Sequence, residues 1–214
     1  MPSAAKTTKR RGRRQGEPVS RDAVLSAAKQ RFATEGYEKT TLRVIAQDAH
    51  VDPSMVLYLF GSKEELFRES LRLIIDPEVL VAALIGAADD DPDIGTRMVR
   101  TYLRIWETPD TAASMRAMLQ SATSNSDAQD AFRGFMQNYV LTAVSRVLGG
   151  GEEARLRAML AAGTLVGTAM LRYIIQVPPL ATLSADEVVK LIAPTVTRYL
   201  AAPANELGLP ELES

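Results

Sequence analysis

The sequence predicts an all-α fold, and three observations support that prediction. Apolar residues recur at helical spacing along most of the chain, and no segment alternates apolar with polar residues as a half-buried strand does. Residue types that cap helices stand directly before several of these apolar segments. The chain is 46% hydrophobic and 24% charged, as is ordinary for a globular protein with a packed core. Its 214 residues suit one small domain joined to a larger one.

The first 19 residues form a basic segment that we expect to be disordered in isolation. Six Lys and Arg residues lie between Lys6 and Arg14, and the segment has few apolar side chains to bury. Two functions are compatible with this composition. The segment is either a solubilising tail or an arm that contacts DNA phosphates or enters a minor groove.

Four helices are predicted next, and their ends have recognisable chemistry. Ser20 caps the first helix, and Gly36 supplies a left-handed stop after it. Thr40 or Thr41 opens the second. Asp52 caps the short third helix, whose first residue is a proline. These helices span about residues 20–35, 40–49, 53–60 and 62–75.

Six further helices follow, separated by clear breaks. They span about residues 76–88, 94–107, 112–122, 128–148, 152–176 and 185–201. The Asp76–Pro77 pair starts the first of them, and Asp93 caps the second after an acidic loop. Three consecutive glycines at 149–151 and a segment with two prolines at 177–180 separate the last three.

The composition excludes several classes of function. The chain has no cysteine, so it forms no disulfide and no thiolate metal site, and its single histidine cannot build a histidine metal cage. No motif places a nucleophile beside His50, so we expect neither an enzyme nor a cofactor. The longest uncharged apolar segment, residues 158–171, is 14 residues long and too short to span a bilayer. We therefore expect a cytoplasmic, nucleoid-associated protein with no membrane partner.

Charge is distributed unevenly along the chain. Residues 1–60 carry 11 Lys and Arg against 6 Asp and Glu, whereas residues 61–214 carry 14 against 20. A basic N-terminal part and an acidic remainder indicate that only the first part meets a polyanion.

Residues 41–60 fit a helix-turn-helix, in which a short second helix enters the major groove of DNA. Ala46 is small enough for the close crossing of two helices, and the chain turns sharply at His50. Three apolar residues then hold the second helix against the first: Val51, Val56 and Leu59. The N-terminal end of that helix stays free to contact base edges.

Residues 20–66 resemble the DNA-binding domain of the TetR family of transcriptional regulators. The resemblance is carried by residues at a fixed spacing: Val24, Leu25, Ala28, Phe32, Gly36, Tyr37, Thr40, Thr41, Ile45, Ala46, Ala49, Val51, Phe60, Ser62, Lys63 and Leu66. The C-terminal segment from Leu171 to Leu200 also resembles a ligand-binding domain common among actinobacterial members. The resemblance implies a basic arm (1–19), a helix-turn-helix DNA-binding domain (20–66), an effector-binding and dimerisation domain (67–202) and a tail (203–214).

The same resemblance implies a ligand-responsive regulator, in most members a repressor. Such a protein binds a palindromic operator in double-stranded DNA as a homodimer, and a small apolar or amphipathic effector releases it. Two other functions remain open on the sequence alone: a nonspecific, nucleoid-type DNA-binding protein that acts through its basic arm, and a small-molecule carrier that keeps the fold.

The family pattern implies DNA contacts at seven positions: Thr41, Arg43, Pro53, Ser54, Met55, Tyr58 and Lys63. Arg43 would bind a guanine edge or a phosphate, and Thr41 and Lys63 would bind phosphates. Three of these positions have a purely structural alternative. Arg43 is otherwise a solvated arginine, Thr41 a helix cap, and Met55 a surface methionine.

Two departures from the family pattern concern this motif. His50 occupies the turn where the family usually has glycine. This turn requires a positive φ, which histidine tolerates better than most residues. It is either a turn residue without another role or a phosphate contact. Leu57 occupies the position of the usual tyrosine, and Tyr58 follows it. Tyr58 either contacts a phosphate or packs against the first helix.

Two sets of residues in the larger domain are assigned by helical spacing and by the resemblance. The expected effector pocket consists of Met98, Tyr102, Trp106, Met115, Met118, Phe135, Met136 and Tyr139, although ordinary core packing is the alternative for each. The expected dimer interface, built from the last two long helices, consists of Leu160, Gly163, Val166, Gly167, Met170, Val188, Ile192, Val196 and Tyr199.

Overall fold

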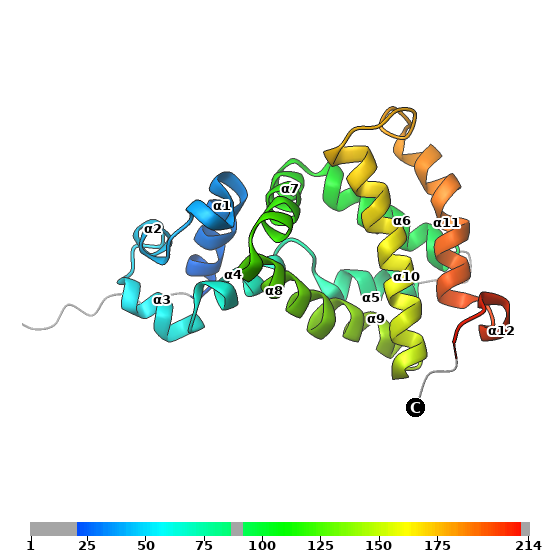
Figure 1. The fold of residues 1–214 in the computed structure, drawn as a ribbon, viewed down its shortest axis with the longest axis horizontal. Helices are drawn as coiled ribbons and strands as arrows, with labels where there is room; N and C mark the ends of the chain where they lie inside the picture. Colours follow the sequence, from blue (N-terminus) through cyan, green and yellow to red (C-terminus); the bar gives the residue numbers. More distant parts are fainter. Residues whose placement is uncertain (1–20, 87–91, 211–214) are drawn as a thin grey trace, which may run out of the picture.

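The computed structural model describes residues 21–86 and 92–210, and these residues form helices without any strand. The predicted basic arm, the Ser20 cap and part of the acidic loop lie outside the described residues. At one end of the molecule are α1 (Arg21–Lys39), α2 (Leu42–Asp48), α3 (Pro53–Phe60) and α4 (Lys63–Leu71) (Figure 1). The predicted all-α class is confirmed.

The other helices form the larger part of the molecule. They are α5 (Pro77–Ile85), α6 (Ile94–Glu107), α7 (Pro109–Ser124), α8 (Ser126–Phe135), η1 (Met136–Leu141), α9 (Thr142–Val147), α10 (Gly151–Ala169), η2 (Met170–Ile174), α11 (Ala185–Ala201) and α12 (Ala204–Leu207). The segments η1 and η2 are wider π-helical turns that continue α8 and α10. The short α12 lies in the segment that the sequence assigned to a tail.

The predicted helix starts are present where the cap chemistry placed them. Asp52, Asp76 and Asp93 each accept backbone N–H bonds at the starts of α3, α5 and α6. Ser184 and Glu187 form a reciprocal capping box at the start of α11. Such side chains satisfy N–H groups that have no partner within the helix.

Glycines in two places, at residue 36 and at residues 149–151, show why the chain turns where it does. Gly36 has a φ of 75°, so α1 bends sharply there and its last residues continue to Lys39 in a new direction. Gly149, Gly150 and Gly151 all have positive φ and form the connection between α9 and α10. Only glycine adopts this backbone region at no steric cost.

The two parts of the molecule are packed together through two pairs of helices. α7 packs along α1, and α8 packs against α4 (Figure 1). The boundary expected near residue 66 therefore falls inside α4, which belongs to both packing units. A continuous core of buried apolar side chains runs through the described residues.

Candidate DNA interface and effector cavity

The short helix α3 has a fixed start and an exposed outer face. The Asp52 carboxylate accepts from the Ser54 backbone N–H at 2.8 Å and from the Ser54 hydroxyl at 2.6 Å. Val56 and Phe60 face the core. Tyr58 is 83% exposed, so it does not pack against the first helix.

The turn before α3 has the geometry that the sequence predicted. His50 has a φ of 54°, which confirms the positive φ expected at this position. The Val51 backbone N–H donates to the carbonyl oxygen of Ala46 at 2.9 Å, and Ala46 is fully buried where α2 meets α3. The His50 side chain is exposed.

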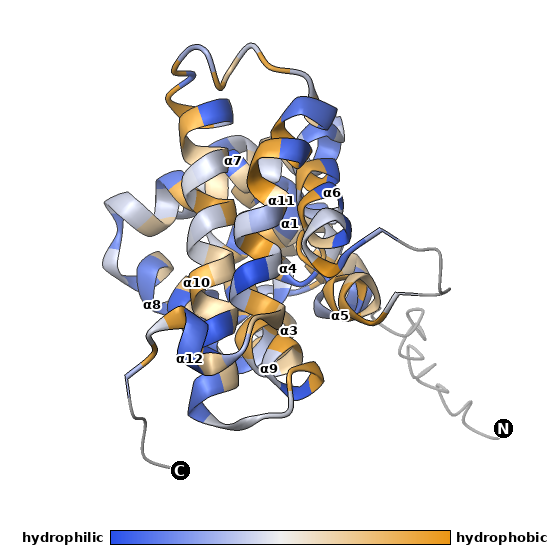
Figure 2. Cartoon of the chain, turned by 90° about the vertical axis from the view of Figure 1, so that its right-hand side faces the viewer, coloured by the Kyte–Doolittle hydropathy of each residue, from blue (hydrophilic) through white to orange (hydrophobic). Residues whose placement is uncertain are grey.

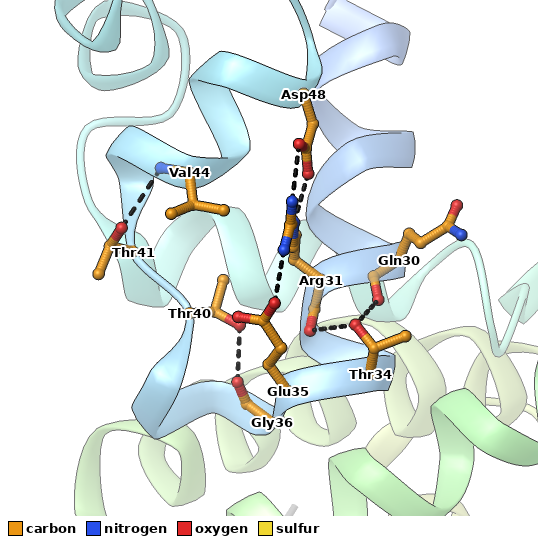
Figure 3. Close-up of polar contacts among 9 residues, drawn as sticks. All are labelled: Gln30, Arg31, Thr34, Glu35, Gly36, Thr40, Thr41, Val44 and Asp48. Atoms are coloured by element: carbon orange, nitrogen blue, oxygen red, sulfur yellow. Dashed lines mark hydrogen bonds and ion pairs between the residues drawn. The ribbon is translucent and has the colours of Figure 1, made fainter.

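Four of the other predicted DNA contacts are also on the surface. Thr41, Arg43, Pro53 and Ser54 are exposed, whereas Met55 is half-buried. The Thr41 hydroxyl caps α2 by accepting from the Val44 backbone N–H at 3.3 Å (Figure 3). This confirms the structural role of Thr41 and leaves its phosphate contact a prediction.

Arg31, which the sequence analysis did not select, fixes α2 relative to α1. Its guanidinium bonds both carboxylate oxygens of Asp48, at 2.8 Å for the Nη2 to Oδ1 pair, and it also pairs with Glu35 (Figure 3). The bond from Arg31 lowers the pKa of Asp48. Arg31 and Asp48 are 17 residues apart in the sequence, so no local pattern identifies the pair.

Lys63 is placed differently from a free surface lysine. Its Nζ lies 4.1 Å above the centre of the Tyr37 ring, and the side chain is half-buried. Burial lowers the pKa of Lys63, although nearby carboxylates on Glu38, Glu64 and Asp127 act in the opposite direction. A phosphate at this position would therefore draw the ammonium away from the ring, or bind beside it at the N-terminus of α4.

Tyr37 joins α1, α4 and the larger part of the molecule. Its hydroxyl donates to Glu64 at 3.1 Å, and burial followed by this bond raises the pKa of Tyr37. Its backbone N–H donates to the Ser121 hydroxyl of α7 at 3.1 Å in a buried position. The Asn125 amide, at the start of α8, donates to Glu38 at 2.6 Å. These two bonds connect the DNA-binding end to the ends of α7 and α8.

A small apolar cavity lies inside the larger part of the molecule. Its volume is about 60 Å³, which equals the share of about two water molecules in liquid water, at ~30 Å³ each. Five of the eight predicted pocket residues line it: Met98, Tyr102, Met115, Met118 and Met136. Other side chains complete the wall, among them Val166, which was predicted for the dimer interface: Ile75, Leu80, Leu119, Phe132, Val140, Leu141, Val144, Ala158, Ala161, Ala162, Leu165, Val166 and Leu200.

The prediction is wrong for the other three pocket residues, Trp106, Phe135 and Tyr139, which do not line this cavity. Trp106 stacks on Tyr173 with ring centres 5.1 Å apart. Phe135 is fully buried and stacks on Tyr139, which in turn lies under the Arg72 guanidinium at 5.1 Å. These aromatic rings share the helical spacing of the lining residues but point in other directions around the helix.

Among the residues that line the cavity, Tyr102 is the only one whose side chain can donate a strong hydrogen bond. It is 6% exposed, and no hydrogen bond of standard geometry reaches its buried hydroxyl, although the Trp106 side chain lies close enough to lower its pKa. Burial raises the pKa of Tyr102 to about 12, so the hydroxyl keeps its proton at neutral pH. The lining residues include no charged side chain.

Helices α10 and α11 lie on the side of the molecule that faces the viewer in Figure 2, and both carry apolar residues that are exposed or half-buried. Among the predicted interface residues, Gly163 and Gly167 are exposed, and Leu160, Val166, Met170, Ile192 and Tyr199 are half-buried. Large apolar side chains that were not predicted are also exposed: Met159 on α10, Leu191 on α11, Leu171 in η2 and Ile175 directly after η2. The two helices therefore offer an apolar surface.

Two interface predictions are wrong. Val188 and Val196 are both 0% exposed, because that face of α11 packs against α6 within the same chain. Their side chains have no surface to offer to another subunit.

Among the described residues, no helix is long and apolar enough to cross a membrane. In the same ranges, no group of three or more His, Cys, Asp and Glu side chains is placed to hold a metal ion.

Comparison with known proteins gives the same family for both parts of the chain. Residues 24–70 match the family described as "Bacterial regulatory proteins, tetR family". Residues 92–200 match the family described as "Tetracyclin repressor-like, C-terminal domain". A TetR-family regulator of Streptomyces coelicolor A3, known from its crystal structure, is 35% identical, and the match covers 88% of this chain and 98% of that one with a TM-score of 0.59.

Two curated bacterial proteins are also similar. The HTH-type transcriptional regulator RutR of Escherichia coli strain K12 is 34% identical over 102 residues, which is 48% of this chain and 45% of RutR. The chain thus matches about half the length of that relative. The HTH-type transcriptional regulator BetI of Agrobacterium fabrum is 24% identical over 179 residues, which is 81% of this chain and 86% of BetI. These relatives are regulators rather than enzymes, and this chain belongs to the TetR family of DNA-binding transcriptional regulators.

Proposed function

We propose that the chain is a homodimeric repressor that binds a palindromic operator and is released by a small-molecule effector. The observation that carries the proposal is α3, a short helix with a capped start and an exposed face that bears Pro53, Ser54 and Tyr58. An α-helix fits the major groove, where every base pair presents a distinct pattern of donors and acceptors. Phosphate contacts from Thr41 and Lys63 would set its position on the duplex.

Dimerisation is supported by the apolar surface of α10 and α11. A Cβ at Gly163 or Gly167 would meet no other atom within 4 Å, so both sites leave room for a close helix from a second copy. A two-fold dimer also provides two recognition helices for two half-sites about one DNA turn apart, roughly 34–36 Å.

The effector part of the proposal rests on α7. Met115, Met118 and Leu119 of this helix line the cavity, and Ser121 of the same helix accepts the buried bond from Tyr37. An effector that favours a shifted position of α7 would therefore also change the support of α1. Its effect on DNA binding is limited to its differential affinity for the two positions.

DNA binding is tested with the purified chain and the DNA upstream of its own gene. We expect a sequence-preferring, salt-sensitive complex with a palindrome, measured by fluorescence anisotropy against unrelated DNA of equal length. Arg43→Ala should relax the sequence preference by about 1–3 kcal/mol at one position, whereas Lys63→Ala should weaken all sequences alike. Arg100→Ala, an exposed arginine of α6, is the control that should change neither. Equal affinity for palindrome and unrelated DNA would contradict the proposal.

The dimer is tested by sedimentation. Leu191 is 62% exposed on α11, and Leu191→Glu should shift the protein towards the monomer because it places a charge in the apolar surface. Ile85→Glu, at a site on α5 that is 67% exposed, is the matched control and should leave the oligomeric state unchanged. A wild-type protein that sediments as a monomer at micromolar concentration would refute the proposed dimer.

A further inference from the structure

A cluster of side chains with unused hydrogen-bonding groups lies between α6 and η2. We call Tyr102, Trp106, Arg172 and Tyr173 the Tyr102 cluster. The Tyr102 ring meets Trp106 edge-on with centres 6.5 Å apart, and Trp106 stacks on Tyr173 at 5.1 Å. The Arg172 guanidinium lies 5.2 Å from the Tyr173 ring centre. Glu107 accepts a hydrogen bond from the Tyr173 hydroxyl at 3.2 Å.

Three buried polar atoms of this cluster have no hydrogen-bond partner. They are Tyr102 Oη, Trp106 Nε1 and Arg172 Nε, three of the four such side-chain atoms among the described residues. All three carry a hydrogen that can be donated. A buried donor without an acceptor is costly, and native proteins generally supply a partner for it. The Trp106 N–H lies close enough to the Tyr102 oxygen to lower the pKa of that group, but the Tyr102 O–H still has no acceptor. This points to a missing acceptor.

The cluster is continuous with the cavity through Tyr102. The Tyr102 ring belongs to the cavity wall, whose other side chains are aliphatic, aromatic or methionine. A molecule in this cavity would bury its apolar part among Met98, Met115, Met118 and Met136, whose flexible side chains allow the space to widen. Its hydrogen-bonding partner in the wall would be the hydroxyl of Tyr102.

We propose that the effector is a small, mainly apolar molecule with a hydrogen-bond-accepting oxygen that faces the Tyr102 hydroxyl. This inference rests on the proposed function, because it names the chemical class of the same effector. The accepting oxygen belongs to a carbonyl or to a carboxylate. Arg172 favours the carboxylate by its charge, but its Nη1 already donates to the carbonyl oxygen of Leu180 at 2.7 Å. The test below distinguishes the two.

Three probes of similar size distinguish a carbonyl oxygen, a carboxylate and the absence of any acceptor. Acetophenone carries a carbonyl oxygen, benzoate a carboxylate, and ethylbenzene no acceptor. Their binding to the full chain is measured by calorimetry and by the fluorescence of Trp106, the only tryptophan of the chain, which contacts Tyr102. We expect acetophenone, benzoate or both to bind about 10-fold more tightly than ethylbenzene, the gain of one net hydrogen bond.

Tyr102→Phe removes the hydroxyl and keeps the ring. We expect this variant to lose the roughly 10-fold advantage of the oxygen-bearing probe while it binds ethylbenzene as well as the wild type does. Tyr139→Phe is the matched control, because Tyr139 does not line the cavity, and it should keep the advantage. If Tyr102→Phe does not fold, as judged by circular dichroism, the ratio of the three affinities on the wild type decides.

Several outcomes overturn the inference. Equal affinity of ethylbenzene and both oxygen-bearing probes would mean that solvent alone satisfies the Tyr102 cluster. If the oxygen-bearing probe keeps its advantage in Tyr102→Phe, its oxygen accepts a hydrogen bond from a group other than the Tyr102 hydroxyl. If none of the three probes shows saturable binding, the proposed class of effector is excluded. DNA binding of the same sample is measured without any probe. Sequence-preferring DNA binding combined with any of these outcomes refutes the effector class alone, whereas its absence contradicts the proposed regulator.

Discussion

Gly95 lies at the crossing of α6 and α11, where the structure leaves no room for a side chain. A Cβ at this position would lie 2.2 Å from Thr197 Oγ1 and 2.3 Å from the carbonyl oxygen of Ala193. It would also lie 2.6 Å from the Thr197 backbone nitrogen. Two of these three atoms belong to the backbone, so no rotamer change relieves the overlap. Gly95→Ala would therefore force the two helices apart by about 1 Å to restore ordinary contact distances.

The expected cost follows from three contributions. Overpacking costs about 1–3 kcal/mol, and the upper end applies because backbone atoms are involved. Separation of the helices also weakens the bond from the Gly95 N–H to Thr197 Oγ1, now 3.1 Å, at about 1 kcal/mol. Alanine regains about 1 kcal/mol of helix propensity. The net loss is about 3 kcal/mol, which corresponds to a fall in Tm of about 6–12 °C for a chain of this size.

Thermal and denaturant unfolding followed by circular dichroism measure this loss. Gly134→Ala is the control, because its Cβ would meet only side-chain atoms: Arg68 Nη1 at 3.2 Å, Arg68 Cδ at 3.6 Å and Asn138 Nδ2 at 4.0 Å. We expect Gly134→Ala to change stability by less than about 1 kcal/mol. If Gly95→Ala were as stable as the wild type, α6 and α11 could not cross as closely as the structure shows, and the burial of Val188 and Val196 would lose its explanation.

Three further outcomes are expected. Asp52→Ala removes the carboxylate that caps α3, so it should cost about 1 kcal/mol of stability and weaken operator binding in a gel-shift titration; unchanged affinity would show that the cap does not fix the recognition helix. Ser121→Ala leaves the buried Tyr37 N–H without an acceptor, so the free energy of unfolding should fall by about 1–3 kcal/mol and the effector should release DNA less completely, whereas an intact effector response would exclude this bond from the coupling. Burial alone would raise the pKa of Asp93, but hydrogen bonds from Thr197, Thr96 and the Gly95 N–H lower it to about 2. Because the folded-state pKa lies below the ordinary value of 3.8, the stabilisation is present above about pH 4 and is lost as the pH falls towards 2; Asp93→Asn should flatten that part of the denaturation profile, and an unchanged profile would contradict this role of Asp93.

Helix positions were predictable because their signals are local. Asp93 and Ser184 are cap residues directly before apolar helices, and the predicted spans 94–107 and 185–201 coincide with α6 and α11. The positive φ at His50 was implied by the resemblance, because the family usually has glycine at this turn. Each of these features depends on atoms within a few residues of each other, which the sequence states directly.

It was harder to predict which face of each helix is buried, because a helix with apolar residues on all sides does not indicate which side packs against the rest of the chain. α11 buries Val188 and Val196 against α6 and exposes Leu191. Helical spacing selects residues that share one side, but it does not say whether that side faces the same chain or a second copy. The distinction depends on where α6 lies, and Gly95 is the residue that allows α6 to approach.

The residues that line the cavity were hard to predict for the same reason. Met115 and Met118 line it, whereas Trp106 and Phe135 pack elsewhere. Residue type indicates that all four are apolar and large, and their helices are correctly placed. Which of them border the empty space depends on the relative rotation of α6, α7 and α8, which long-range packing decides.

The connection between the cavity and the recognition helix involves few atoms, and its energy can be bounded. Leu119 borders the cavity, and Ser121 follows it by two residues on α7. A shift of α7 must either carry Tyr37 with it or break the buried bond between Tyr37 and Ser121, which costs about 1–3 kcal/mol. Coupling between two sites of an allosteric protein is typically of the same size, about 1–3 kcal/mol. In the proposed mechanism, loss or retention of this one contact would therefore be large enough for a 5- to 150-fold change in operator affinity, without any contact between the effector and the DNA-binding helices.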